Sequence, residues 1–216
     1  MSSQPLIRWS GIALVLGGLI QIVIGFLHPD ENAPGSLLNP MFATVHLIAA
    51  VGFMATAFGL IGLYLRQVEA GGKLNIIAFL IAFVGTVLTV GFVIDEAFFL
   101  VDLAQRNPAV QTLNDFAPNA TPAVQGYLPV LLGGLMVYLL GWILTGIAAF
   151  RAGVFPRWVG VLIGIGVVLT FGSLAGAHIV RVIGGVVFGA GLIGAGAALF
   201  GRQTESSAAM QAQLAK

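Results

Sequence analysis

The sequence predicts an all-α integral membrane protein in which six transmembrane helices form one bundle and both termini lie in the cytoplasm. Three observations predict this fold class: the composition, the apolar stretches, and the distribution of Lys and Arg between the loops. The chain has 216 residues, of which 58% are hydrophobic and 8% are charged. An ordinary soluble domain is about 45–50% apolar and about 25% charged, so these few charges cannot cover a soluble surface.

The charge and the cysteine content exclude several classes of function. The formal net charge of +1 is no electrostatic footprint for nucleic acid, so we expect no nucleic-acid partner. The absence of cysteine excludes disulfides, thiolate nucleophiles and cysteine-ligated metal sites. Any metal chemistry must therefore use histidine, carboxylate or carbonyl groups.

Six apolar stretches are long enough to cross a hydrocarbon core of about 30 Å, which takes about 20 helical residues. Polar or Gly/Pro-rich segments separate them, although the break before the last stretch is weak. The stretches cover residues 9–27, 41–65, 74–94 and 127–150, a fifth that begins at residue 158, and a sixth that ends at residue 202. We therefore predict one transmembrane domain over residues 1–202. Residues 203–216 form a polar tail, expected as a short exposed helix or a disordered end.

The basic residues predict the orientation of the bundle, because Lys and Arg in short loops stay on the cytoplasmic side of a membrane. With the amino terminus inside, seven basic residues lie on the inner side and two on the outer side. The inner residues are Arg8, Arg66, Lys73, Arg151, Arg157, Arg202 and Lys216, and the outer ones are Arg106 and Arg181.

The ionisable side chains near the spans collect at one depth. At a rise of 1.5 Å per residue, His46 lies about 8 Å inside the second span and Asp95 lies at the outer end of the third. His28 ends the first span, and His178 and Arg181 lie in the turn between the fifth and sixth. The histidines and their acidic neighbours therefore share the outer third of the bilayer. Ionisable groups at membrane depth are costly, so this layer is a functional-site hypothesis.

One interpretation of this layer is a cofactor or metal site. Imidazole suits iron, copper and zinc, and the three histidines come from three separate helix regions. The candidate ligands of a divalent metal are His46, Asp95, Glu96 and His178. The candidate ligands of a b-type haem are His46, His178 and His28.

The other interpretation of the layer is structural. Carboxylates at helix ends pair with cations, and such pairs lock neighbouring helices together. The residues expected in these pairs are Asp95, Glu96, Asp102, Arg106 and Arg181, and Arg106 follows Asp102 by four residues on a helix.

Glycines in the last two spans predict close helix packing. Gly160 and Gly164 lie four residues apart in the fifth span, and Gly185 and Gly189 have the same spacing in the sixth. Such spacing lets helix backbones approach closely. We expect these faces to pack within the bundle, and a homodimer would extend the same packing.

Three segments are similar to segments of other membrane proteins. They are residues 28–40, with His28 and the Asn39-Pro40 pair, residues 59–67 (GLIGLYLRQ), and residues 141–158, with the turn FRAGVFPRW. In these motifs, which cover about the whole membrane region, the chain resembles uncharacterised bacterial multi-spanning plasma-membrane proteins. The resemblance implies a six-helix bundle in a bacterial inner membrane. It implies no activity.

The sequence leaves three functions open. The first is an accessory or scaffold subunit of a membrane complex, whose partners are the lipid bilayer and other membrane subunits. The second is a redox protein that binds a metal or haem, and the third is a small cation- or proton-coupled transporter. Motifs of soluble-type catalysis, such as His-Glu-x-x-His and Gly-x-Ser-x-Gly, are absent from the sequence. The sequence therefore favours a role other than that of an enzyme.

Overall fold

The structure of the chain, a computed structural model, describes residues 4–112, 115, 122–172 and 177–214. This part of the chain consists of helices and connecting loops and contains no β-strand. The helices, in chain order, are α1 (Gln4–Leu27), the short 3₁₀ turn η1 (Ser36–Leu38), α2 (Pro40–Gln67), α3 (Gly72–Asp95), the π-helical turn η2 (Glu96–Leu100), α4 (Val101–Arg106), α6 (Pro122–Ala152), α7 (Arg157–Gly172) and α8 (His178–Leu214).

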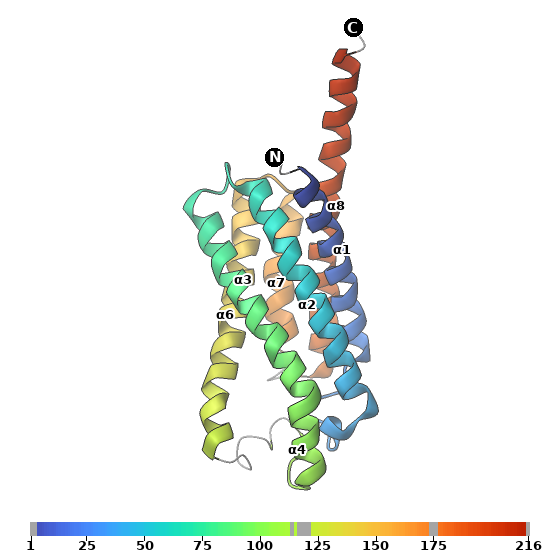
Figure 1. Cartoon of the computed structure of the whole chain (residues 1–216), viewed down its shortest axis with the longest axis vertical. Coiled ribbons are helices and arrows are strands. Elements are labelled where there is room, and N and C mark those ends of the chain that lie inside the picture. Colours follow the sequence, from blue (N-terminus) through green and yellow to red (C-terminus); the bar gives the residue numbers. More distant parts are fainter. Residues whose placement is uncertain (1–3, 113–114, 116–121, 173–176, 215–216) are drawn as a thin grey trace.

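The six long helices form a bundle, as the sequence predicts. Around the bundle each packs on the next in the order α8, α1, α2, α3, α6, α7 and back to α8. Figure 1 shows the helices side by side, with both chain ends at the same end of the bundle and α8 projecting beyond it. The tail after residue 202 therefore continues α8 as helix to Leu214.

Five helices are long and apolar enough to cross a membrane: α1, α2, α3 with its continuation to Arg106, α6 and α8. The remaining helix, α7, has 16 residues and is about 24 Å long. It is therefore shorter than the hydrocarbon core of about 30 Å. The described residues give five to six long apolar helices, and α7 is the one that differs from the expected set of six full spans.

Large apolar side chains fill the interior of the bundle, and apolar side chains also cover its outer surface. Trp142 and Phe188 are fully buried and meet edge to face, and Tyr138 packs beside them. Outward-facing side chains include Trp9, which is 68% exposed, and Phe58, which is 66% exposed. Exposed apolar side chains over the whole circumference fit contact with lipid chains rather than with water.

Glycines bring α1 and α8 into close contact. A Cβ built on Gly189 would lie 2.5 Å from the carbonyl oxygen of Gly18, and one built on Gly185 would lie 2.8 Å from that of Gln21. Real Cβ atoms do not approach backbone atoms so closely. The structure therefore uses this glycine face of α8 inside the bundle, against α1.

The two glycines of α7 that were expected to pack, Gly160 and Gly164, differ from each other. A Cβ on Gly160 would lie 2.5 Å from the carbonyl oxygen of Gly146 on α6, whereas a Cβ on Gly164 would meet no atom within 4 Å. Of this pair, only Gly160 is therefore required to be glycine by contact at its own Cβ position.

Candidate metal centre

Two imidazole rings meet at the end of the bundle opposite the chain termini. His28 follows the last residue of α1, and His46 lies on the second turn of α2. Their Nε2 atoms are 3.4 Å apart, and their ring centroids are separated by 4.8 Å in an edge-to-face arrangement. His28 is 7% exposed and His46 is 3% exposed. This pair is the centre of the candidate site.

Each ring is held by a hydrogen bond from its other nitrogen. Nδ1 of His28 donates to the carbonyl oxygen of Pro29 over 2.8 Å, and Nδ1 of His46 donates to that of Phe42 over 2.7 Å. A carbonyl oxygen only accepts, so both Nδ1 atoms carry hydrogen. In the neutral rings both Nε2 atoms are then acceptors that face each other. Two such lone pairs at this distance need a cation between them, either a proton on one ring or a metal ion.

Glu31 supplies a carboxylate beside the two rings. Its Oε1 atom lies 3.5 Å from Nε2 of His28, and its Oε2 atom lies 2.6 Å from Nη2 of Arg181 on α8. Ligand atoms of His28, Glu31 and His46 all lie within 4.8 Å of one another. Because Arg181 holds one oxygen of Glu31, the other oxygen remains available to a cation at the imidazoles.

A second carboxylate, Glu96, approaches from α3. Its Oε2 atom lies 3.3 Å from Nε2 of His46, and its side chain is 19% exposed. Glu96 is the first residue of the π-helical turn η2 that follows Asp95. A π-helical turn changes the rotation of the residues that follow it and occurs frequently at functional sites. The cluster therefore joins the ends of α1, α2, α3 and α8 that lie opposite the chain termini.

Burial changes the protonation of the two loop residues that follow α1. It lowers the pKa of His28 well below its ordinary value, and the positive charge of Arg181 adds to this effect. It also raises the pKa of Glu31, because the desolvation outweighs the stabilising charge of Arg181. His28 is therefore held neutral, which is the form that binds a metal. The positive charge of Arg181 offsets only part of the cost of burying the Glu31 carboxylate.

The distances fit a small divalent ion. With metal–nitrogen bonds of about 2.0–2.1 Å, neighbouring ligand atoms in a tetrahedral site are about 3.3–3.4 Å apart. The separations of the His28 Nε2 atom from His46 Nε2 and from Glu31 Oε1 are 3.4 and 3.5 Å. The wider separations in the group, up to 4.8 Å, require one side chain to move inward when an ion binds.

The structure brings together some of the residues expected from the sequence and adds others. His28, His46 and Glu96 converge, whereas Asp95 and His178 are not among the described residues whose ligand atoms form this group. Glu31 was not expected. Its only signal in the sequence is its position three residues after His28, in the turn that Pro29 begins.

Two ion pairs involve residues that the sequence analysis expected in such pairs. Arg181 pairs with Glu31, which was not among those residues. Arg106 pairs with Asp102 four residues earlier, with Nε and Oδ2 at 2.9 Å, and both side chains are mostly exposed. This second pair is a surface contact, which contributes little to stability.

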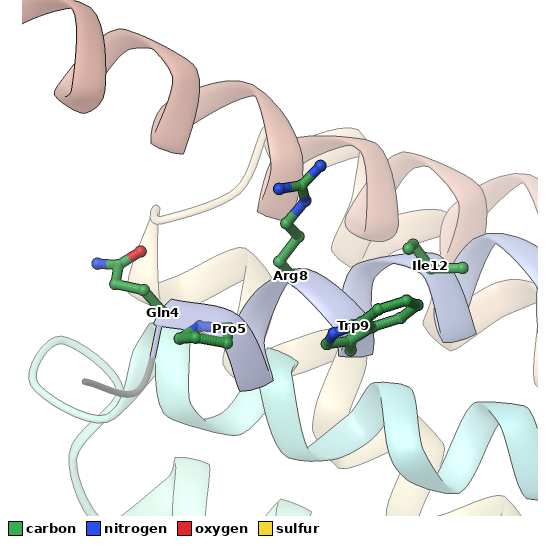
Figure 2. A pocket seen from close by; sticks show the side chains of 5 residues that line it. All are labelled: Gln4, Pro5, Arg8, Trp9 and Ile12. Carbon is green, nitrogen blue, oxygen red and sulfur yellow. The ribbon is translucent and has the colours of Figure 1, made fainter. Parts of the chain in front are cut away.

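A surface groove of about 430 Å³ lies at the other end of the bundle, along the first turns of α1. Figure 2 shows the side chains that line it, with Arg8 and Trp9 beside each other on the helix. The lining, Gln4, Pro5, Arg8, Trp9 and Ile12, contains one cation and no imidazole or carboxylate. This groove therefore lacks the ligands that the cluster at the opposite end provides.

Comparisons with known proteins give no further guide: no family model, no curated protein and no solved structure matches the chain. The functional argument consequently depends on the geometry of the cluster.

Proposed function

We propose that the chain is a plasma-membrane protein, bacterial and with both termini cytoplasmic, that binds one divalent transition-metal ion with His28, His46 and Glu31. The observation that carries this proposal is the pair of Nε2 atoms 3.4 Å apart, each on a ring whose Nδ1 hydrogen is already donated to a carbonyl. Metal-binding histidines have this arrangement, because the bond from the second nitrogen fixes the tautomer and the ring orientation.

The donor set indicates the class of metal. Imidazole nitrogen with carboxylate oxygen suits Zn²⁺, Fe²⁺ and similar ions, whereas Ca²⁺ and Mg²⁺ prefer oxygen ligands alone. Arg181 supports the ligand Glu31 from outside the coordination shell. The geometry favours an ion over haem between His28 and His46, since rings in edge-to-face contact leave no room for a porphyrin plane.

The two other functions considered from the sequence have less support. The scaffold hypothesis depended on free glycine faces, but Gly160, Gly185 and Gly189 pack against other helices of the same chain. Transport needs polar groups that continue through the bundle. The buried hydroxyls of Thr56 and Thr86 instead bond carbonyls of their own helices.

Metal titration of the detergent-purified protein tests the proposal. After removal of bound metal with a chelator, calorimetry with Zn²⁺ and elemental analysis should give one ion per chain. His46→Ala should abolish stoichiometric binding, whereas His178→Ala, which removes the histidine outside the cluster, should retain it. Equal binding by the two variants, or no binding by the wild type, would contradict the proposal.

A further inference from the structure

The groove along the first turns of α1 changes from polar to apolar along its length. Gln4, Arg8 and Ile12 follow one another at intervals of four residues and so lie on one face of the helix, with Pro5 and Trp9 next to them. Figure 2 shows Arg8 between Gln4 and Ile12 on this face. Ile12 lies about 6 Å farther along the helix than Arg8. The volume of about 430 Å³ falls within the range of sites for small ligands, about 300–1,000 Å³.

The groove contains the positive charge of Arg8. This side chain is exposed, and no carboxylate in the described part of the chain forms an ion pair with it. Where the structure describes side chains at the end of the bundle that carries the chain termini, it gives one acid, Glu69, and five cations: Arg8, Arg66, Lys73, Arg151 and Arg157. Such an excess of positive charge attracts anions and repels cations. A group that lies next to Arg8 should therefore be anionic.

An apolar stripe continues the same face of α1 beyond the groove. Its residues follow one another at spacings of three or four positions, and each is at least 40% exposed: Ile12, Leu16, Leu19, Val23 and Phe26. The stripe is about 21 Å long, which is more than half of a hydrocarbon core of about 30 Å. The acyl chains of one leaflet can therefore lie along the stripe while an anionic group attached to them reaches Arg8. A soluble anion makes no contact with the stripe, so this surface fits an anionic lipid better.

We infer that the groove binds the headgroup of an anionic phospholipid. The phosphate of this lipid accepts hydrogen bonds from the guanidinium of Arg8, because the paired N–H groups of arginine match two phosphate oxygens. Trp9 lies beside the headgroup, at the membrane boundary where tryptophan is favoured, and the acyl chains follow the stripe that begins at Ile12. The site is separate from the metal centre at the opposite end of the bundle, and its test does not depend on a metal ion.

Lipid binding by the wild type and two variants tests the inference. Wild type, Arg8→Gln and Arg151→Gln are purified in a mild detergent, and native mass spectrometry measures their affinities for dioleoylphosphatidylglycerol and dioleoylphosphatidylcholine. The wild type should prefer the phosphatidylglycerol, because the basic end of the bundle repels the choline cation of the other lipid. Arg8→Gln should weaken phosphatidylglycerol binding about 10–100-fold, the usual contribution of a hydrogen bond to a charged group. Arg151→Gln removes the same charge from the end of α6, which packs between α3 and α7, and should weaken binding about 5-fold or less.

A second measurement detects lipid at the groove by fluorescence. In vesicles, phosphatidylglycerol with brominated acyl chains should quench tryptophan emission more than brominated phosphatidylcholine at the same mole fraction. Trp9→Phe should remove this difference. Arg8→Lys, which keeps the positive charge, should lose less affinity for phosphatidylglycerol than Arg8→Gln does.

Four results would overturn the inference. The first is equal affinity of the wild type for the two lipids, and the second is a quenching difference that Trp9→Phe leaves unchanged. The third is an equal loss of affinity in Arg8→Gln and Arg151→Gln, which would show attraction by the charge of the whole end of the bundle. The fourth is displacement of the lipid by excess inorganic phosphate, which would show a site for soluble anions.

Discussion

Gly160 and Gly164 of α7 allow the packing of the bundle to be tested with one substitution made at two positions. Gly160→Ala places a Cβ 2.5 Å from the carbonyl oxygen of Gly146, about 0.9 Å closer than the 3.4 Å at which ordinary contact begins. That carbonyl belongs to the backbone of α6 and cannot turn away, so the two helices must separate locally. Gly164→Ala places the same methyl group in open space.

The magnitude follows from comparing the two variants. Alanine gains about 1 kcal/mol over glycine in a helix, but this gain applies to both positions and cancels in the comparison. The difference in unfolding free energy is therefore the cost of overpacking, which is about 1–3 kcal/mol. We expect Gly160→Ala to be the less stable variant by this amount.

Reversible unfolding in mixed micelles of a mild detergent and SDS, followed by tryptophan fluorescence, measures both variants. Gel filtration of the same samples reports the oligomeric state. If Gly164→Ala costs as much as Gly160→Ala, the assignment of the α6–α7 contact to Gly160 is refuted. A loss of oligomers in Gly164→Ala alone would instead place a contact between chains at that glycine.

Three further predictions concern the cluster and the core. Arg181→Gln should weaken Zn²⁺ binding about 10–100-fold in calorimetry, because loss of a residue that hydrogen-bonds a metal ligand has this effect in other metal sites. Unchanged affinity would show that Arg181 does not support Glu31 as a ligand. Thr86→Val leaves the buried Trp142 Nε1, now 3.0 Å from the Thr86 hydroxyl, without an acceptor and should cost about 1–3 kcal/mol. Thr89→Val, which removes only a bond to a carbonyl of the same helix, should cost less, and equal losses of unfolding free energy would contradict this account. Zn²⁺ at 100 times its dissociation constant should raise the unfolding free energy by about 2.7 kcal/mol, and a similar rise in His46→Ala would show that the ion binds elsewhere.

Much of the fold could be predicted from hydropathy, because each span must bury its own backbone polar groups in a helix when lipid surrounds it. The apolar stretches accordingly match the long helices, although α1 and α6 begin about five residues earlier than the stretches do. The third span differs more. Its apolar stretch ends at residue 94, but the backbone continues as helix through η2 into α4, since carboxylates at a helix end near the head groups do not have to stop the helix.

The candidate site could be predicted only in part. The depth of a side chain follows from its distance along the helix, so the convergence of His28, His46 and Glu96 at one level could be anticipated. The sequence did not predict the direction in which a side chain points around the helix axis. Nor did it predict the path of the chain after a proline. For this reason Glu31, which was not among the expected site residues, lies in the group of ligand atoms with His28 and His46.

Composition and the lengths of the apolar stretches were by themselves enough to determine that the chain forms helices for a lipid environment and has its histidines near one end of them. These properties depend on the free energy of transfer from water to hydrocarbon, which can be added up residue by residue. The tertiary structure alone decided that two histidine nitrogens face each other beside Glu31, with Arg181 from the last helix behind it. That arrangement depends on how four helix ends rotate and pack against one another, and this is set by side-chain shape across residues up to 150 positions apart.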